Sequence, residues 1–335
     1  MFLDAFFRLF ATDSEDELKL RNFLKCGLAV IAFAVTLGGC GGSDDDENDF
    51  SFTGTIAVVA KEQGFNAFVA AVTKASIGSF SDPNAQLTVF APTDQAFDTL
   101  AKQLGFADAT AMVNALPANT LQSILNYHVL GSKKLAADLS AGGPTQQTAY
   151  TFENAPATLR FDFSNGVKIT DAALTVATVV TPDIPARNSV IHAIDKVLIP
   201  PGLLNIVQMA QVNPTFSSLV SALVVADLQG TLSGAGPFTV FAPTNAAFPA
   251  APLNLSTAQL RTILTYHVVL GQVLSTQIPY DTPVPTVSMQ TISFVAGTPP
   301  AIRDTTSTLA NIVAVDVRAS NGVIHVIDKV LIPTL

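Results

Sequence analysis

The sequence is poor in charged residues, in cysteine and in long apolar runs, and each shortage excludes a class of protein. Charged residues make up 13% of the 335 residues, whereas soluble domains average roughly 25%. The 17 lysines and arginines form no basic stripe and the net charge is −9, which excludes nucleic-acid binding because phosphate contacts need clustered cations. Two cysteines supply no disulfide framework. The lack of recurring apolar runs of about 18 residues excludes a protein with many membrane spans.

Residues 1–39 are predicted to be a targeting signal rather than part of a fold. Basic side chains precede a short apolar core from Cys26 to Leu37, an order typical of a secretory signal. The core ends in the run Leu37-Gly38-Gly39-Cys40, which resembles the lipobox of bacterial lipoproteins. The resemblance implies cleavage before Cys40, acylation of that cysteine and attachment to a membrane by the lipid. An ordinary cleaved signal and an uncleaved anchor are the alternatives.

Residues 1–18 fit this signal poorly, because acidic residues between Asp13 and Glu17 stand where a basic region belongs. We therefore expect translation to start near Leu18. After the cysteine, small residues and an acidic run predict a solvated tether over residues 40–51, since like charges repel and little apolar area is available to bury. Gly41, rather than aspartate, follows the cysteine, which in a Gram-negative cell favours anchoring in the outer membrane.

The remainder of the chain consists of two similar units in tandem. Three motifs recur in the same order with decreasing separation, which excludes chance and indicates a tandem duplication. We call residues 52–201 repeat 1 and residues 203–335 repeat 2. The motifs are TVFAPTDQAF at Thr88 and TVFAPTNAAF at Thr239, YHVL at Tyr127 and YHVV at Tyr266, and NSVIHAIDKVLIP at Asn188 and NGVIHVIDKVLIP at Asn321.

Each repeat is predicted to have a helical first half and a β-rich second half. Apolar spacing typical of a helix covers residues 56–73 and 206–225, and a helix is expected to end at each Tyr-His pair. Short β-rich runs end in each Ala-Pro-Thr, and further strands follow the Tyr-His pairs. The run Ser164-Asn165-Gly166 predicts a hairpin turn between two of these strands. The fold class is therefore α+β.

The duplicated motifs resemble the fasciclin domain over nearly all of the chain after Cys40. The resemblance implies that each repeat is a β-sandwich or wedge of about seven strands with helices packed around it. It also implies an extracellular or envelope location and a role in adhesion, matrix contact or self-association without catalysis. The expected partners are a cell-surface or matrix protein or polysaccharide, a second copy of the chain, and the membrane through the lipid.

Four histidines are the strongest candidates for chemistry, and all of them lie in the repeated motifs: His128, His192, His267 and His325. A metal site needs several converging ligands, but each repeat has two histidines, no cysteine and no HExxH spacing. A serine hydrolase is disfavoured because no GxSxG motif occurs. We therefore predict no enzyme, no metal and no cofactor. The histidines are expected to bond to backbone groups or to carboxylates, with Asp195 and Asp328 on neighbouring strand positions.

The residues after each Ala-Pro motif are interpreted as helix caps. Thr93 or Asp94 in repeat 1, and Thr244 or Asn245 in repeat 2, are residue types that accept hydrogen bonds from the first turn of a helix. Each repeat is therefore expected to start a helix at this point of the chain.

The Tyr-His pairs are the candidate interaction surface. In animal proteins of the fasciclin family this segment is linked to integrin contact, so the resemblance nominates Tyr127, His128, Tyr266 and His267. The chain contains no Arg-Gly-Asp run. The alternative, which the residue types favour, is that tyrosine packs its ring while histidine bonds locally at the end of the helix.

The sequence thus predicts a non-enzymatic adhesion or matrix-interaction protein of the cell envelope. A second hypothesis is a periplasmic module that binds a ligand or glycan in a groove between the repeats, because Pro200-Pro201 makes a short, stiff link between them. Ligand-dependent thermal stabilisation would favour this second hypothesis.

Overall fold

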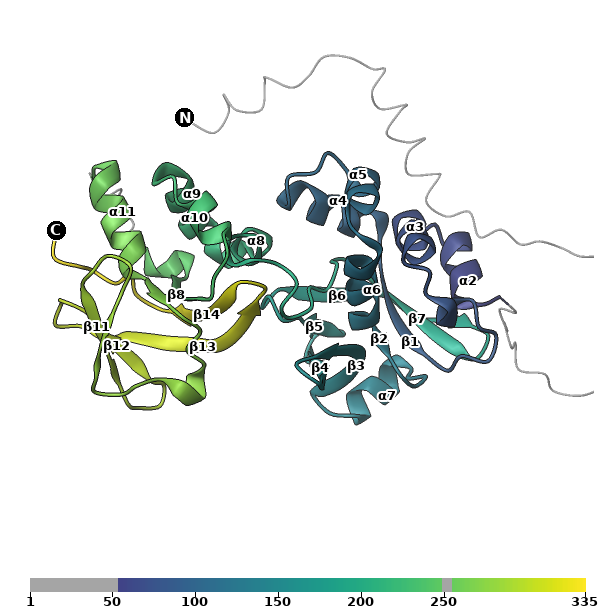
Figure 1. Cartoon of the computed structure of the whole chain (residues 1–335). Helices are drawn as coiled ribbons and strands as arrows, with labels where there is room; N and C mark the ends of the chain where they lie inside the picture. The colour runs from purple at the N-terminus through teal and green to yellow at the C-terminus, as the bar shows by residue number, and fades with distance from the viewer. Residues whose placement is uncertain (1–53, 249–254) are drawn as a thin grey trace, which may run out of the picture. The chain divides into compact units, whose positions relative to one another are not determined.

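The computed structural model describes residues 54–248 and 255–335. The predicted signal, Cys40 and the whole predicted tether lie outside the described residues, so the statements about them stay predictions. In the part of the chain that is described, none of the helices is both long and apolar enough to cross a bilayer. Figure 1 shows the helices and strands of both repeats.

Repeat 1 is a mixed sheet with helices packed against it. Its strand order is β2-β1-β7-β6-β5-β4-β3. The strands are β1 (Thr88–Pro92), β2 (Val129–Leu130), β3 (Thr145–Phe152), β4 (Ala155–Asp162), β5 (Lys168–Thr170), β6 (Val176–Ala186) and β7 (Ser189–Ile194). The helices are α2 (Ile56–Glu62), α3 (Asn66–Ala75), the 3₁₀ turn η1 (Gly78–Phe80), α4 (Asp94–Gln103), α5 (Ala109–Ala115), α6 (Ala118–Tyr127) and α7 (Ala136–Ala141).

Repeat 2 has the same sheet with fewer described helices. Its strand order, read from the corresponding edge, is β9-β8-β14-β13-β12-β11-β10. The strands are β8 (Phe238–Pro243), β9 (Val268–Leu270), β10 (Pro283–Pro285), β11 (Thr291–Val295), β12 (Ala301–Arg303), β13 (Ala310–Ala319) and β14 (Gly322–Ile327). The helices are α8 (Ile206–Val212), α9 (Ser217–Val225), α10 (Gln229–Ser233) and α11 (Thr257–Tyr266), with 3₁₀ turns η2 (Pro214–Phe216), η3 (Asn245–Ala247) and η4 (Ser275–Gln277).

The duplicated motifs form the centre of each sheet. β1 runs parallel to β7 with Thr88 opposite Val190, and β8 runs parallel to β14 with Thr239 opposite Val323. Every residue of β1 and of β14 is buried, which explains why these strands are almost continuously apolar rather than alternating. The α+β class and the seven-stranded sheet of each repeat are confirmed.

Each sheet folds over on itself and encloses a core of its own. In repeat 1 the rings of Phe90 and Phe161 lie 5.7 Å apart, although they stand on strands β1 and β4 that are far apart in the sheet order. Repeat 2 has the same contact between Phe241 and Phe294 at 5.4 Å. The tyrosines of the Tyr-His pairs belong to these inner cores.

The two stretches predicted to be helical, residues 56–73 and 206–225, are mostly helical, but each is divided into two helices by a break that the spacing did not predict. In repeat 1 the break lies between α2 and α3 at Gly64, whose φ of +81° ends a right-handed helix at no steric cost. In repeat 2 the break lies at Asn213-Pro214, where Asn213 accepts a hydrogen bond from Thr215 N and proline cannot continue the preceding helix. Apolar spacing alone predicts neither break.

Candidate functional site

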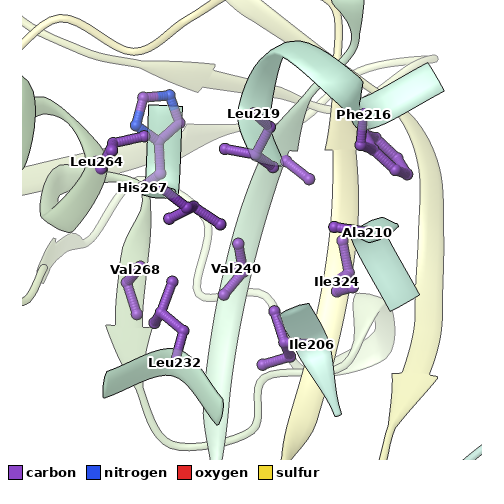
Figure 2. Close-up of a pocket in the computed structure, with 12 residues that line it drawn as sticks. Ile206, Ala210, Phe216, Leu219, Leu232, Val240, Leu264, His267, Val268 and Ile324 are labelled. Atoms are coloured by element: carbon purple, nitrogen blue, oxygen red, sulfur yellow. The ribbon is translucent and has the colours of Figure 1, made fainter. Parts of the chain in front are cut away.

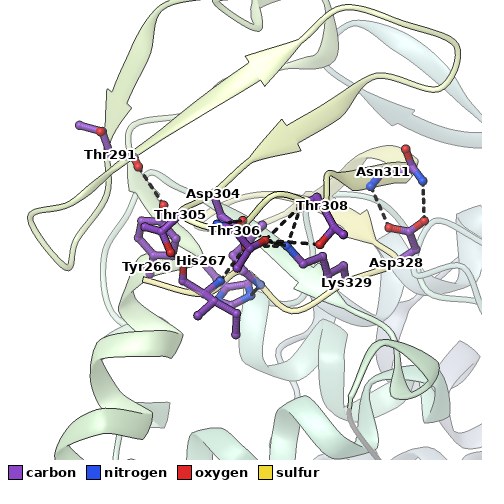
Figure 3. Close-up of polar contacts among 12 residues, drawn as sticks. Tyr266, His267, Thr291, Asp304, Thr305, Thr306, Thr308, Asn311, Asp328 and Lys329 are labelled. Atoms are coloured by element: carbon purple, nitrogen blue, oxygen red, sulfur yellow. Dashed lines mark hydrogen bonds and ion pairs between the residues drawn. The ribbon is translucent and has the colours of Figure 1, made fainter. Parts of the chain in front are cut away.

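The tyrosines of the Tyr-His pairs fasten the ends of helices α6 and α11 to a neighbouring strand. Neither Tyr127 nor Tyr266 is exposed. The hydroxyl of Tyr127 donates to Thr158 O on β4 (3.0 Å), and that of Tyr266 donates to Thr291 O on β11 (2.8 Å) (Figure 3). Burial raises the pKa of both phenols, that of Tyr266 to about 12. These hydroxyls therefore act as hydrogen-bond donors and not as acids.

The histidine that follows each tyrosine is a buried link between two stretches of main chain. His128 Nδ1 lies 2.7 Å from Ile124 O, and its Nε2 accepts a hydrogen bond from Leu198 N at 2.8 Å. Because Nε2 faces a donor, the single ring proton of the neutral form must be on Nδ1. Repeat 2 has the same contacts, between His267 Nδ1 and Ile263 O (2.8 Å) and between Leu331 N and His267 Nε2 (2.9 Å).

Burial keeps these two imidazoles neutral. It lowers the pKa of His128 and of His267 to about 4, because the charged form has no water around it. A second proton would also place a donor on Nε2 against the amide N–H of Leu198 or Leu331. Both rings therefore serve as neutral connectors at ordinary pH.

The candidate interaction surface needs a correction. The side chains of Tyr127, His128, Tyr266 and His267 are at most 2% exposed, so in this fold they offer no contact surface to a partner. The physical reason is that the last turn of each helix points into the inner core of the sheet. The Tyr-His pair is buried inside the domain, where its histidine bonds to the segment that ends the repeat.

A buried aspartate holds the next amide of that segment, and the sequence analysis did not single it out. Asp171 Oδ2 accepts from Ile199 N at 2.9 Å, next to the bond between His128 and Leu198. We call His128 with Asp171 the clamp of repeat 1. The clamp of repeat 2 is His267 with Asp304, whose Oδ2 accepts from Ile332 N at 2.9 Å. The available signal was the run Ile-x-Asp, which recurs at Ile169 and Ile302.

The two clamps differ in the groups that surround the aspartate. Asp171 is surrounded by neutral donors, namely the amides of Ala173, Thr175 and Ile199 and the Thr175 hydroxyl. Burial raises the pKa of Asp171 to about 6, although these donors oppose the shift.

In repeat 2 the ammonium of Lys329 lies 2.8 Å from Asp304 Oδ2 (Figure 3). Lys329 Nζ also donates to Thr306 Oγ1 (2.6 Å) and to Thr308 O (2.8 Å). Burial alone would raise the pKa of Asp304, but hydrogen bonds from Lys329 and Thr306 hold it below its usual value. Lys196 is the counterpart of Lys329, and in the described part of repeat 1 no hydrogen bond or ion pair of its side chain is found.

The second histidine of each repeat supports a bend in the neighbouring long strand. His192 Nδ1 accepts from Asp183 N (3.1 Å) and Nε2 donates to Lys134 O (3.0 Å). Asp183 has a φ of +58°, at an irregularity in the pairing of β6 with β7. The equivalent contacts in repeat 2 join Asp316 N to His325 Nδ1 (3.4 Å) and His325 Nε2 to Val273 O (2.9 Å). Burial lowers the pKa of both histidines.

The carboxylates expected beside these histidines lie elsewhere, so that part of the interpretation is corrected. Asp195 accepts from Thr178 N (2.6 Å), and Asp328 accepts from the backbone and side-chain nitrogens of Asn311 at 2.7 and 2.8 Å (Figure 3). The reason is periodicity, since residues three apart on a strand point to opposite faces of the sheet.

The four predicted capping residues perform different tasks in the two repeats. Thr93 begins α4, and its hydroxyl accepts from Ala96 N (3.2 Å). Thr244 begins only the 3₁₀ turn η3 and makes no side-chain cap bond, so the helix predicted there is corrected to a single turn. Asp94 and Asn245 accept bonds from other helices, at Ala67 N of α3 (2.8 Å) and Ser218 N of α9 (2.9 Å) respectively. Both therefore cap the start of a helix that precedes them in the chain.

A small apolar cavity of about 20 Å³ lies in the core of repeat 2 (Figure 2). It is lined by Ile206, Phe216, Leu219, Val240, Leu264 and His267, among others. At the position of Leu219 repeat 1 has Phe68, whose ring packs on Phe80 at 5.7 Å. A space of this size holds about one water molecule and no larger ligand. The cavity is thus a packing defect and carries no binding function.

The described residues offer little for catalysis or metal binding. Residues 54–248 and 255–335 contain no group of three or more histidine, cysteine or carboxylate side chains placed to hold a metal ion. Each histidine ring has both nitrogens occupied by main-chain groups. Neither a free general base nor an activated nucleophile follows from this arrangement.

Comparison with known proteins points to one family. The family model of the fasciclin domain matches twice, at residues 63–200 and 214–333. Protein sll1483 of Synechocystis sp. is 41% identical over 142 residues, which is 39% of this chain and 75% of that protein. The cell surface glycolipoprotein MPB83 of Mycobacterium bovis is 36% identical over 132 residues, 36% of this chain and 57% of its own length. A solved FAS1 domain pair from the insect cell adhesion molecule fasciclin I covers 82% of this chain and 98% of its own, with 19% identity and a TM-score of 0.40.

Proposed function

Because the chain belongs to the fasciclin-domain family, we propose that it is a non-enzymatic adhesion protein of the cell envelope. Its expected partners are cell-surface or matrix proteins or polysaccharides. Family membership supports a role in adhesion, and the similarity to a protein named as a cell surface glycolipoprotein supports a surface or extracellular location.

One observation carries the non-enzymatic part of the proposal. The four histidines are the residues best suited to acid–base chemistry, and all of them are buried and bonded on both ring nitrogens. The same arrangement occurs in both repeats, which suits a structural role in a duplicated domain better than a single active site. What is left for function is the outer surface of the repeats, in a chain of which only 13% of the residues are charged.

We also propose that Cys40 is acylated and anchors the chain, with residues 40–51 as a tether and the outer membrane as the location in a Gram-negative cell. The support is the order of basic residues, apolar core, small residues and cysteine in the sequence. Incorporation of a labelled fatty acid tests the acylation, with Cys40→Ser as the control that should lose the label. Protease treatment of intact cells then reports which face of the membrane carries the repeats.

Deletion of residues 53–335 tests adhesion itself. The truncated chain should keep its acyl label, and cells that carry it should attach to surfaces or aggregate less than cells with the full chain. Full-length Cys40→Ser is the matched control, because it keeps both repeats and loses only the anchor. Unchanged attachment after the deletion would refute the proposed role.

A further inference from the structure

The run Ser-Asn-Gly-Val occurs twice in the sequence, at Ser164 and at Ser320, in two different structural settings. Asparagine is chemically labile in proteins, because the main-chain nitrogen of the next residue can attack its side-chain amide. Glycine as the next residue has no Cβ to hinder that attack. Since the two runs have the same four residues, a difference in their reactivity must come from the fold.

The first run is the turn between β4 and β5 of repeat 1 (Figure 1). The sequence predicted a hairpin turn here, and the two strands pair with Asp162 opposite Lys168. Ser164, Asn165 and Gly166 are all exposed. Gly166 has a φ of +73°, which glycine adopts without strain, and a Cβ placed on it would meet no atom within 4 Å beyond its chain neighbours. The turn is therefore open to water.

The side chain of Asn165 is not held in place by the rest of the described chain. Ser164 N donates to Asp162 Oδ1 (2.9 Å), but among the residues that the structure describes no hydrogen bond of the Asn165 amide is found. The side-chain carbon Cγ can therefore turn toward the Gly166 nitrogen at no cost in lost contacts.

The second run begins β14 of repeat 2, and there the asparagine is held at both ends of its amide. Asn321 Nδ2 donates to Leu232 O and to Gly234 O, both at 2.8 Å. Its Oδ1 accepts from Ile206 N at 3.0 Å. Rotation of the Asn321 side chain toward the next main-chain nitrogen would break all three hydrogen bonds.

The glycine of the second run is confined as well. Gly322 is buried and pairs with Phe238 of the neighbouring strand β8. The Phe238 main chain lies so close that a Cβ on Gly322 would stand 2.0 Å from the Phe238 oxygen. The Gly322 nitrogen can reach the side chain of Asn321 only after the strand opens locally, and central strands open rarely.

We propose that Asn165 is a site of spontaneous deamidation and that the fold protects Asn321 from the same reaction. The Gly166 nitrogen loses its proton and bonds to Asn165 Cγ, and the side-chain nitrogen leaves as ammonia, which gives a five-membered succinimide ring. Water then opens the ring at either carbonyl and leaves aspartate or isoaspartate. One water is consumed and one ammonia released. The modification goes beyond the proposed adhesion role, because it needs no partner, enzyme or lipid anchor.

Both products change the turn of repeat 1. Each adds a negative charge close to Asp162, and isoaspartate also lengthens the main chain by one methylene group. The length of a turn helps to set the register of the strands that it joins. The pairing of Asp162 with Lys168 is thus expected to loosen, while the buried pair of Phe161 and Ile169 keeps the strands together.

Repeat 2 has no asparagine in the corresponding turn. β11 and β12 correspond to β4 and β5, and the residues between them are Ala296-Gly297-Thr298-Pro299-Pro300. Repeat 1 would therefore acquire with age an acidic turn that repeat 2 does not acquire.

Incubation of the folded full chain at pH 7.4 and 37 °C, followed by digestion and mass spectrometry, measures both sites in one sample. The peptide with Asn165 should convert to its acid forms about a hundredfold faster than the peptide with Asn321, because Asn321 reacts only from a locally opened state. In urea the two sites should react at similar rates, since their local sequence is identical. An isoaspartyl methyltransferase with a labelled methyl donor detects isoaspartate independently.

Asn165→Gln is the matched control variant. It keeps an amide in a turn of the same length, but ring closure would need a six-membered ring, so the folded variant should lose the methyl label. Circular dichroism checks that the variant is folded. A folded chain in which Asn165 stays intact while the chain in urea reacts would overturn the proposal. Equal rates at the two sites in the folded chain, or a methyl label that Asn165→Gln retains, would also overturn it.

Discussion

In each repeat a histidine and an aspartate bond to the segment that ends the domain. The pKa of the aspartate is shifted in opposite directions in the two repeats. In repeat 1, Asp171 is buried among neutral donors and its pKa is raised to about 6. In repeat 2, Asp304 faces Lys329 at 2.8 Å and its pKa is lowered. Histidines with the same contacts and the same lowered pKa stand beside both aspartates. The two clamps therefore share their geometry and differ in the electrostatic surroundings of the aspartate.

This difference shows that the hydrogen-bond geometry of the clamp and the pKa of its aspartate can vary independently. The hydrogen bond to the amide of Ile199 or Ile332 needs only an acceptor oxygen at the right place. Whether that oxygen prefers to be charged depends on groups outside the shared contacts, in repeat 2 chiefly the ammonium of Lys329 and the hydroxyl of Thr306. The clearest experiments therefore compare the repeats with each other.

The largest expected effect is a selective loss of stability of repeat 2 in acid. The folded-state pKa of His267 is about 4, below its unfolded value near 6.5, so the unfolded chain binds the proton first and stability falls as pH decreases from about 6.5 to 4. The loss is about 3 kcal/mol. Asp304, with a lowered pKa, adds a further loss below its unfolded value near 3.8.

Repeat 1 should change much less, because its two groups oppose each other. His128 loses stability over the same range as His267. Asp171 has a raised pKa, so the folded chain binds its proton first and gains about 3 kcal/mol between pH 6 and 4. His192 and His325, whose pKa values burial also lowers, add a loss in the same direction to both repeats.

Hydrogen exchange resolved by peptide measures both repeats in one sample. Protection of the amides of β14 should fall between pH 7 and pH 4 far more than protection of β7, after correction for the intrinsic pH dependence of exchange. His267→Gln removes the titrating group and should flatten the response of β14. Equal losses in β7 and β14 would contradict the electrostatic difference between the clamps.

A smaller effect is expected from removal of the lysine of repeat 2. Lys329→Met leaves Asp304 buried without its cation and should lower the free energy of unfolding at pH 7 by about 2 kcal/mol. Lys196→Met in repeat 1 is the matched control and should change it by less than about 0.5 kcal/mol. Urea unfolding at pH 7 measures both variants. Lys329→Met should also give repeat 2 the flatter acid response of repeat 1, and similar costs for the two variants would show that Lys329 does not stabilise the carboxylate.

The sequence predicted most of the fold, and the reason lies in repetition. The TVFAP and VIH motifs occur twice with buried, β-rich composition, so their strands could be placed before any coordinates. The strand pairing could not, because β1 lies next to β7 only through contacts between residues about a hundred positions apart. The breaks at Gly64 and Pro214 were also unpredicted, since helical periodicity continues on both sides of them.

The site was predicted less well than the fold. The Tyr-His pairs were located correctly as motifs, but a pair of residues at the end of a helix does not reveal whether it points to solvent or to the core. Asp171 and Asp304 were overlooked because a lone aspartate after a short strand resembles an ordinary turn residue. Their role depends on the amides of Ile199 and Ile332, which are distant in sequence.

The smallest expected effect concerns packing beneath α3 and α9, where repeat 1 has Phe68 and repeat 2 has Leu219. Phe68→Leu should leave a space in repeat 1 like the cavity of about 20 Å³ in repeat 2, at a cost of about 1 kcal/mol in the free energy of unfolding. Leu219→Phe should return less than that, because the neighbour across the cavity is the buried Leu232 rather than a phenylalanine, and the new ring lacks the aromatic partner that Phe80 gives Phe68. Thermal unfolding of the two variants measures the difference. A larger gain from Leu219→Phe than the loss from Phe68→Leu would show that the cavity, and not the missing aromatic pair, limits the stability of repeat 2.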